Sequence, residues 1–415
     1  MSIVRLGDIC QFINGGAWTQ SEFSDYGYPV LKVSNCKPSG FVIDDVSFIP
    51  LDIAEKSEIN KLHIHDVIIA TVGSHPNLVD SAAGRSCVVT NEVDGYYLNQ
   101  NAVCLRTLDR NVLNQRYLGF LTQYFPFQHY IQNRGKGAAN QMRIAISAIK
   151  EYTFDLPNIE IQDKIANILS AYDDLIENNQ KQIKLLEEAI QRLYKEWFVD
   201  LRFPGHETTP LVDGVPEGWK STAFSEVFDF VRGKSYTSKE LSDTDGMLMV
   251  NLKNIRAFGG YKRNAEKRFL GTCKENQLVD GGDVVMGVTD MTQERRLVGH
   301  VALVPTFNEK ATFSMDLIKL VPYSVSKNYL YSSLRYGGYS NQIAPLANGV
   351  NVLHLKPEAI MKMEMLVPNE DIMQSFDKLF ESIRLKIEAL EKECDLAAQA
   401  RDRLLPKLMS GELEV

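Results

Sequence analysis

At 415 residues the chain is too long for one ordinary hydrophobic core, and about two to three domains are expected. Its content of 44% hydrophobic and 24% charged residues is typical of a globular protein, and no apolar run is long enough to cross a membrane. The net charge of −8 argues at first against a nucleic-acid partner.

The charge is unevenly distributed along the chain. Residues 155–200 and 367–415 together carry −9, whereas residues 1–154 and 201–366 together carry +1. Basic residues cluster at positions 106–150 and 253–274, where seven Lys or Arg accompany a single acid in each case. Such clusters suit DNA phosphates, although a solvated basic face explains them equally well.

Cysteine usage and the N-terminus indicate the compartment. The six cysteines include no C-x-x-C pair, which favours reduced core residues over a disulfide framework or a zinc site. The first residues lack the apolar core of a signal peptide. We therefore expect a cytoplasmic protein.

Residues 1–154 predict a first globular domain of short strands separated by Gly, Pro and Asn. The strands are expected at residues 29–34, 66–71, 85–90 and 102–106. A helix is expected at about 112–133, and Pro126 should break or kink it.

Residues 155–200 predict a first long helix, with its regular part at 160–198. Apolar residues recur there at alternating steps of four and three, which is typical of a coiled-coil seam, and a polar Asn179 lies inside it. The predicted seam positions are Tyr172, Ile176, Asn179, Ile183, Leu186, Ile190, Leu193 and Trp197.

Residues 201–366 predict a second globular domain, which a Pro- and Gly-rich linker at 201–218 introduces. Its strands are expected at residues 247–252, 283–288, 299–305 and 316–321.

Residues 367–415 predict a second long helix and a C-terminal tail. The seam repeats at Ile383, Ile387, Leu390, Cys394, Ala397, Leu404 and Leu408, and Arg401 is the one poor fit. Each helix is expected to be roughly 60 Å long. An antiparallel pair, with the globular domains at opposite ends of a rod, is the simplest way to bury both seams. A parallel pair, or helices that each pack only on their own domain, are the alternatives.

The second half of the chain repeats the first at an offset of roughly 211 to 218 residues. Asp66-Val67-Ile68-Ile69 parallels Asp283-Val284-Val285-Met286, and Leu156-Pro157-Asn158 parallels Val367-Pro368-Asn369. The predicted fold is therefore mixed α+β: two similar domains are joined by two long helices in an internal pseudo-twofold repeat.

Catalytic motifs are not found in the sequence. Gly233-Lys234-Ser235 has Phe228 where a phosphate-binding loop needs its first glycine, and neither G-x-S-x-G nor H-E-x-x-H occurs. The Asp/Asn-Pro-Pro-aromatic tetrapeptide of amino-methyltransferases is also missing. A metal site at His63 and His65, or a nuclease site of scattered acids, is an open but weakly supported alternative.

Polar loops near the start, middle and end of each domain are better candidates for a functional site than any catalytic motif. Arg, Lys, Asn and Gln pair with base edges, and Ser, Thr and backbone amides suit phosphates. The loops differ between the copies, as expected for a reader of two sequences, although ordinary drift after duplication has the same effect. The candidate DNA-binding residues are Trp18, Thr19, Gln20, Ser74, His75, Arg134, Lys136, Asn140, Gln141, Arg143, Arg232, Lys234, Lys253, Arg256, Thr289, Gln293, Arg295, Arg296, Asn348 and Asn351.

The whole chain resembles the DNA-specificity subunits of type I restriction-modification systems. The motifs that carry the resemblance are Arg5-Leu6-Gly7-Asp8-Ile9, Asp66-Val67-Ile68, Gly282-Asp283-Val284-Val285, Val215-Pro216-Glu217-Gly218-Trp219-Lys220 and the ending 403–413. The first domain-to-helix joint lacks the doubled proline common in this family.

The resemblance implies two target-recognition domains that each read one half of a split site in double-stranded DNA. It also implies antiparallel helices that set the distance between half-sites and dock two methylation subunits. S-adenosylmethionine would be used by those partners, and ATP and Mg²⁺ by restriction subunits. The chain itself would be non-catalytic, without cofactor, metal or membrane contact. A two-headed protein–protein adaptor and a DNA-modifying enzyme with cryptic motifs are the alternatives.

Overall fold

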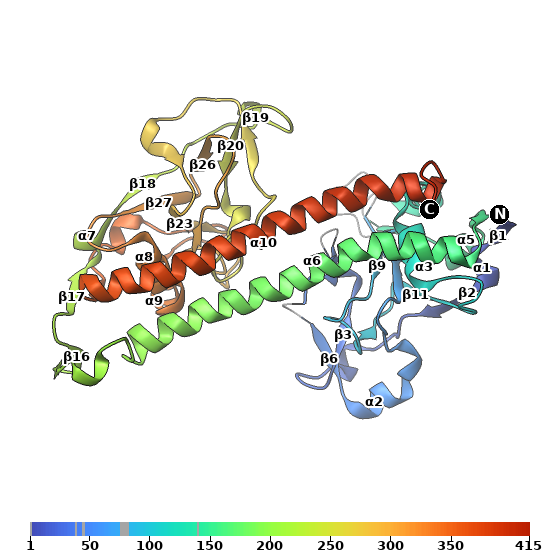
Figure 1. Ribbon diagram of the computed structural model, residues 1–415, viewed down its shortest axis with the longest axis horizontal. Helices are drawn as coiled ribbons and strands as arrows, with labels where there is room; N and C mark the ends of the chain where they lie inside the picture. The colour runs from blue at the N-terminus through green and yellow to red at the C-terminus, as the bar shows by residue number, and fades with distance from the viewer. Residues whose placement is uncertain (1, 38–39, 44–45, 75–82, 139–140) are drawn as a thin grey trace. The chain divides into compact units, whose positions relative to one another are not determined.

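The computed structural model describes residues 2–37, 40–43, 46–74, 83–138 and 141–415 (Figure 1). The chain divides into two compact units. Unit 1 contains residues 1–178 and 393–415, and unit 2 contains residues 179–392. The boundaries cut through the long helices, so each unit includes part of both. The sequence predicts helical segments at 155–200 and 367–415, and in the structure side chains of both helices pack into the core of each unit.

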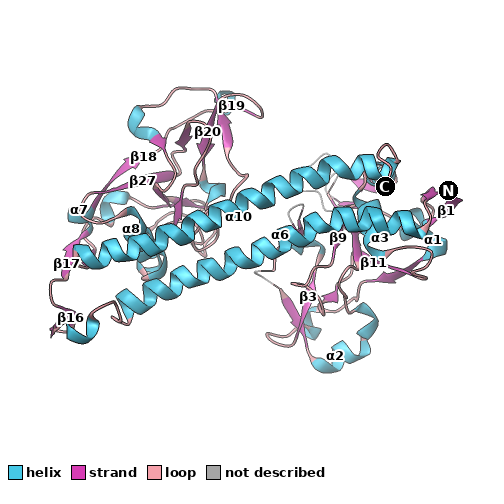
Figure 2. Cartoon of the chain, in the orientation of Figure 1, coloured by secondary structure: helices cyan, strands magenta, loops and turns pink. Residues whose placement is uncertain are grey.

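Two long helices run through the chain (Figures 1 and 2). Helix α6 spans Ile159–Tyr194 and continues into a π-helical turn at Lys195–Val199, and helix α10 spans Glu370–Ser410. The described helices, these two included, contain none with the length and apolarity needed to span a lipid bilayer.

The two helices are antiparallel within each unit. In unit 1, Asp173 pairs with Arg401, and the carbonyl of the later residue Ile176 accepts from the Cys394 thiol at 3.8 Å. In unit 2, the Tyr194 and Phe376 rings lie 6.3 Å apart. The predicted antiparallel arrangement is therefore confirmed.

The predicted seam lies on the inner face of the helices. Asn179, Ile190, Trp197, Leu390, Ala397 and Leu408 are buried, and the remaining seam side chains are half-buried. Ile165 and Leu169 of α6 join Leu404 and Leu408 of α10 in the core of unit 1.

Unit 1 is built on a four-stranded antiparallel sheet in the order β2-β11-β7-β9. The strands are β2 (Cys10–Asn14), β11 (Ala102–Thr107), β7 (Val67–Ala70) and β9 (Ser86–Val88). Alternate side chains supply two cores: Val67 and Leu105 pack with residues of α3 (Gln115–Gln123) and α4 (Phe125–Gln132), whereas Ile68 and Cys104 face the opposite side.

The predicted helix at 112–133 is two helices, α3 (Gln115–Gln123) and α4 (Phe125–Gln132). The break falls at Tyr124, and Pro126 occupies the first turn of α4, where its missing N–H costs nothing. The expected break at this proline is confirmed. On the other side of the unit lie β3 (Tyr28–Leu31), β6 (Ser47–Ile49), β10 (Tyr97–Leu98) and α2 (Leu51–Lys56).

Unit 2 repeats this plan with the sheet order β18-β27-β23-β25. Its strands are β18 (Phe228–Arg232), β27 (Leu317–Pro322), β23 (Val284–Gly287) and β25 (Val301–Leu303), covered by α8 (Lys327–Tyr336) and α9 (Tyr339–Ile343). A five-stranded sheet lies beside it. That sheet contains β19 (Leu241–Ser242), β21 (Lys267–Phe269), β20 (Met247–Val250), β26 (Ala311–Phe313) and β22 (Leu278–Val279).

Short elements complete both units. Each begins with an antiparallel pair that leads into a one-turn helix: β1 (Ser2–Arg5) with β14 (Thr153–Leu156) before α1 (Leu6–Ile9), and β17 (Lys220–Ala223) with β29 (Glu364–Val367) before α7 (Phe224–Val227). The others are α5 (Ile146–Lys150), β4 (Cys36–Lys37), β5 (Gly40–Phe41), β15 (Leu211–Val212) and β16 (Val215–Pro216).

The two units repeat hydrogen bonds as well as strands. Buried Asp66 accepts from the His63 backbone N–H at 2.8 Å, and its counterpart Asp283 accepts from the Asp280 N–H at 3.0 Å. Both carboxylates stand just before the central strand of their unit. The internal repeat predicted from the sequence is therefore confirmed in atomic detail.

Candidate nucleic-acid interface

The polar loops of unit 1 leave the strands of the central sheet at the same end. We call this end of the sheet its loop-bearing edge. Strand β2 ends there, and the Gly15 N–H donates to the Ala102 carbonyl at 3.1 Å. Ala102 opens β11 opposite Ala70, the last residue of β7. The first two polar loops therefore start side by side.

Glycine is required at this edge in both copies. A Cβ on Gly15 would lie 1.9 Å from the Asn99 carbonyl oxygen, and one on Gly233 would lie 2.0 Å from that of Ser314. The close backbone approach accounts for the glycine in Gly233-Lys234-Ser235, so this glycine need not belong to a phosphate-binding loop.

A small sheet brings the third loop of unit 1 to the same edge. Strand β8 (Val72–Gly73) pairs with β13 (Gln141–Arg143), which pairs with β12 (Lys136–Ala138). Lys136 lies directly opposite Arg143. Two cations facing each other across a ladder repel, so this pair gains from a bound anion.

Unit 2 gathers its loops in the same way. Arg232 and Gly287, at the ends of β18 and β23, flank the first residues of β27. Strand β24 (Thr289–Asp290) then pairs with β28 (Leu353–His354), which joins the loop at 291–296 to the one at 347–351. The Gln293 amide donates to the Val350 carbonyl at 2.9 Å.

The buried Asp290 carboxylate fixes the first of these loops. It accepts from the Thr292 N–H at 2.8 Å, the Leu297 N–H at 2.6 Å and the Val298 N–H at 3.2 Å. Burial raises the pKa of Asp290, but these hydrogen bonds outweigh it and leave the pKa below its ordinary value. The loop is therefore held by a carboxylate that stays ionised at neutral pH.

Most predicted DNA-binding residues remain accessible. The exposed ones are Thr19, Gln20, Arg134, Lys136, Arg143, Arg232, Lys253, Arg256, Gln293, Asn348 and Asn351. Ser74, Lys234, Arg295 and Arg296 are half-buried. Arg295 has a backbone φ of 54°, an uncommon value for a side-chain-bearing residue, and its Nε lacks a hydrogen-bond partner among the described residues.

Two predictions fail because the side chains are interior. Trp18 is 8% exposed, packs with Val30 and Ile49, and donates to the Ser57 hydroxyl at 3.4 Å. Thr289 is buried, and its hydroxyl donates to the Asp316 carboxylate at 3.1 Å. Neither side chain is available to DNA. His75, Asn140 and the Gln141 side chain lie outside the described residues.

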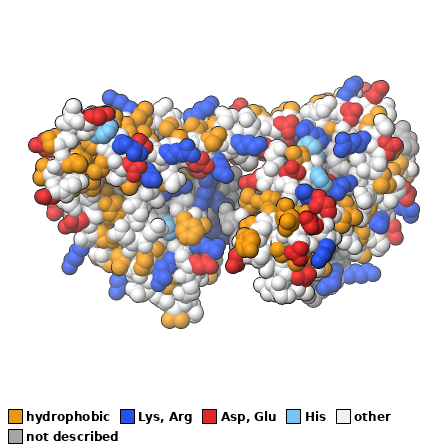
Figure 3. Space-filling model, turned by 90° about the horizontal axis from the view of Figure 1, so that it is seen from below, with side chains coloured by type: hydrophobic (Ala, Val, Ile, Leu, Met, Phe, Trp, Pro, Cys, Tyr) orange, Lys and Arg blue, Asp and Glu red, His pale blue; other side chains and the backbone are white. Residues whose placement is uncertain are grey.

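Several members of the basic clusters have internal partners. Arg106 pairs with Asp66 at 2.7 Å, and Arg116 with Asp174 of α6 at 3.3 Å. In the second cluster, Arg256 pairs with Glu187 of α6, Arg263 with Glu391 of α10, and Arg268 with Glu309. On the face shown in Figure 3, basic side chains accordingly lie among acidic ones rather than forming one continuous basic surface.

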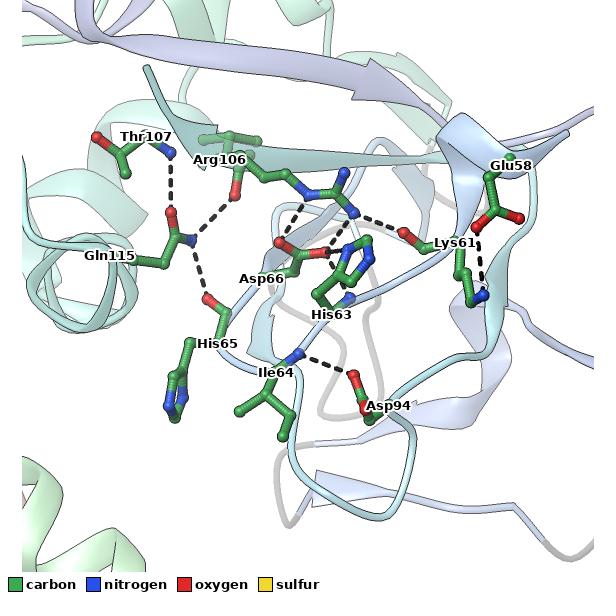
Figure 4. Close-up of polar contacts among 11 residues, drawn as sticks. Glu58, Lys61, His63, Ile64, His65, Asp66, Asp94, Arg106, Thr107 and Gln115 are labelled. Atoms are coloured by element: carbon green, nitrogen blue, oxygen red, sulfur yellow. Dashed lines mark hydrogen bonds and ion pairs between the residues drawn. The ribbon is translucent and has the colours of Figure 1, made fainter. Parts of the chain in front are cut away.

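The His63–Asp66 segment has a structural role (Figure 4). Asp66 accepts two hydrogen bonds from the Arg106 guanidinium, and Arg106 also donates to the Lys61 carbonyl. The His63 ring lies beside this carboxylate, whereas the His65 ring points away from it. Among the described residues, no group of three or more His, Cys, Asp or Glu is placed to hold a metal ion.

Two apolar residues of the unit 2 loops were missed by the sequence reasoning. Met291 and Val350 are exposed in otherwise polar segments. Apart from Trp18, the residues that the sequence predicts to bind DNA are polar, and an isolated apolar side chain in a loop carries no periodic signal.

Comparison with known proteins agrees with this geometry. The type I restriction modification DNA specificity domain matches residues 1–188. The MjaIX specificity subunit of a type I restriction enzyme from Methanocaldococcus jannaschii is 26% identical over 72% of this chain and 69% of its own length. A putative MjaX specificity subunit from the same organism is 23% identical over 99% of this chain and 93% of its own.

A solved structure shares the fold. The type I restriction-modification S subunit from M. genitalium has a TM-score of 0.57 and 16% identity, covering 98% of this chain and 95% of that one.

The duplicated fold is therefore shared with a solved S subunit, and the proteins that this sequence resembles are specificity subunits of type I restriction enzymes. Residues 1–188 thus match a type I restriction modification DNA specificity domain, and most of the chain is similar to specificity subunits of type I restriction enzymes.

Proposed function

We propose that each unit reads one half of a split site in double-stranded DNA. One observation carries this proposal: the same sheet edge gathers the polar loops in both units, while the loop side chains differ. Unit 1 presents the cations Lys136 and Arg143, and unit 2 presents the amides Gln293, Asn348 and Asn351. Cations suit phosphates and guanine, whereas amides suit adenine.

The helices supply the second part of the proposal. Antiparallel α6 and α10 set the spacing between the half-sites and dock two methylation subunits. The excess of acidic residues over 155–200 and 367–415 disfavours DNA as the partner of these helices and suits a protein surface. The methylation subunits use S-adenosylmethionine, restriction subunits add ATP- and Mg²⁺-dependent cleavage, and this chain contributes recognition.

Single-molecule sequencing tests the proposal by mapping methyladenine in cells with and without the chain. A split, asymmetric motif that loses methylation without the chain is the expected result, and it gives both half-sites and their spacer. Unchanged methylation in cells with active partner subunits contradicts the proposal. Binding that is insensitive to salt would instead indicate a protein–protein adaptor, since phosphate contacts weaken steeply as salt rises.

A further inference from the structure

Two apolar side chains are strongly exposed on the loops at the loop-bearing edge of unit 2. Val350 is 86% exposed and Met291 is 79% exposed, although each belongs to a loop that is otherwise polar. Exposed apolar atoms favour a partner that offers apolar surface.

Both side chains are carried on ordered loops. Met291 directly follows Asp290, whose carboxylate binds the backbone of the next turn through Thr292, Leu297 and Val298. Val350 lies at the tip of a turn closed by hydrogen bonds in both directions between the backbones of Asn348 and His354. The Gln293 amide links the two loops through the Val350 carbonyl. These hydrogen bonds therefore hold the backbone that carries each of the two apolar side chains.

The surrounding groups identify the partner's chemistry. Gln293, Asn348 and Asn351 can each bond a base edge, and the loop at 291–296 carries two arginines against one acid, Glu294, which pairs with Arg296. A surface with these neighbours suits a polyanion with hydrogen-bonding edges. The 5-methyl group of a pyrimidine is the apolar group that such edges present in the major groove.

We propose that Met291 and Val350 contact the 5-methyl group of a thymine in the half-site read by unit 2. The contact makes these two residues specificity determinants beside the polar ones. This inference rests on the proposed function, because it assumes that the edge of unit 2 meets DNA.

The test uses the full chain, with any subunits that accompany it on purification, and duplexes that carry the mapped site. Each thymine of both half-sites is replaced in turn by deoxyuridine, which removes only the methyl group. Affinity is measured by fluorescence anisotropy for the unaltered chain and for Met291→Ala and Val350→Ala. Leu211→Ala is the matched control, because Leu211 is 61% exposed on the β15–β16 hairpin.

We expect one deoxyuridine to weaken binding of the unaltered chain and the Leu211→Ala variant roughly fourfold. This change in affinity corresponds to the free energy of burying one methyl-sized group. The same replacement should have little effect on Met291→Ala or Val350→Ala. A second series with 5-methylcytosine in place of each cytosine identifies the methyl source: tighter binding there, without any loss on replacement of thymine by deoxyuridine, overturns the assignment to thymine.

Specific binding that ignores deoxyuridine and 5-methylcytosine at every position overturns this inference and leaves the proposed function intact. An equal loss in the unaltered chain and both variants also overturns it. Absence of any sequence-specific binding removes the proposed function as well.

Discussion

Arg401 of α10 donates to the Asp173 carboxylate of α6 within unit 1. Arg401 occupies the one seam position that the heptad pattern fills with a charge, and Asp173 lies next to the seam residue Tyr172. Burial raises the pKa of Asp173, and the hydrogen bond from Arg401 opposes that rise. The apparent misfit in the seam is therefore a paired charge between the helices.

Arg401→Leu should destabilise the chain, although leucine is the better seam residue. The change leaves Asp173 beside the seam without its cation. We expect a loss of roughly 2 kcal/mol, less than for a fully buried pair because Asp173 keeps some solvent access. Urea unfolding of the full chain measures it.

The double variant Asp173→Leu/Arg401→Leu separates charge from packing. It should recover most of the lost stability, because replacing both members of a buried pair by apolar residues is often neutral. Arg192→Leu is the control: Arg192 makes a surface ion pair with Glu188, and its removal should change stability by less than about 0.5 kcal/mol. A double variant as unstable as the single one contradicts the assignment.

Lys136→Ala/Arg143→Ala should weaken recognition of a single half-site. The two cations lie opposite each other on β12 and β13 and suit phosphate. Removing them should reduce the slope of log affinity against log salt by about 1 per cation. Titrations of the full chain at several salt concentrations measure this slope.

Arg110→Ala is the matched control for that experiment. Arg110 is exposed and follows the far end of β11, opposite the edge where the loops gather. Its removal should leave the slope unchanged. Equal effects from both changes would mean that the basic cluster acts as a diffuse charged face.

Adding one heptad to each long helix should lengthen the DNA spacer. Seven residues inserted after Asn178 and after Lys392 keep the seam in register and add about 10 Å. That length corresponds to about three base pairs. The methyladenine motif should keep both half-sites and gain this spacer. A four-residue insertion, which disrupts the seam register, is the control, and an unchanged spacer with the heptad would rule out the helices as a ruler.

The stability of unit 1 should fall as the solution is acidified below about pH 6.5. The His65 ring Nε2 lies 3.2 Å from the Arg116 Nε–H and accepts from it only when neutral. Burial lowers the pKa of His65 below its ordinary value of 6.5, and the Arg116 charge lowers it further. The unfolded chain therefore takes up a proton first as the pH drops, which favours unfolding.

His65→Asn should reduce this acid sensitivity. Asparagine tolerates the backbone φ of 72° at this position and does not titrate. Hydrogen exchange of unit 1 amides at pH 7.5 and pH 5.5 isolates the effect from buried His300 in unit 2, whose pKa burial also lowers. An identical pH dependence in the variant and the unaltered chain would exclude His65 as the cause.

The periodic features of the chain were predictable from its sequence. The steps of four and three along α6 and α10 predicted the seam, and the punctuation by Gly, Pro and Asn predicted the strands that the structure shows as β7 and β23. The break at Pro126 followed from its missing N–H and its fixed φ. These signals are local, so they survive without knowledge of the tertiary structure.

The way in which short strands bring the polar loops together at the loop-bearing edges was not predictable from the sequence. The ladders β8–β13 and β24–β28 are two residues long on at least one side and join segments far apart in the chain. Strands that short have no periodicity. The burial of Trp18 depends on β3 and β6, which the Gly-Gly-Ala-Trp segment does not reveal.

The buried aspartates of the two units have acquired different cations. Asp66 is neutralised by Arg106 of β11, whereas Asp283 is neutralised by Lys327 of α8 at 2.6 Å, with Lys319 of β27 nearby. Arg106 corresponds by strand register to Val321, not to either lysine. Exchanging one of these residues between the copies would leave a carboxylate or an ammonium group buried without compensation. An exchange of residues between the copies should therefore preserve stability only when each aspartate moves together with its own cation.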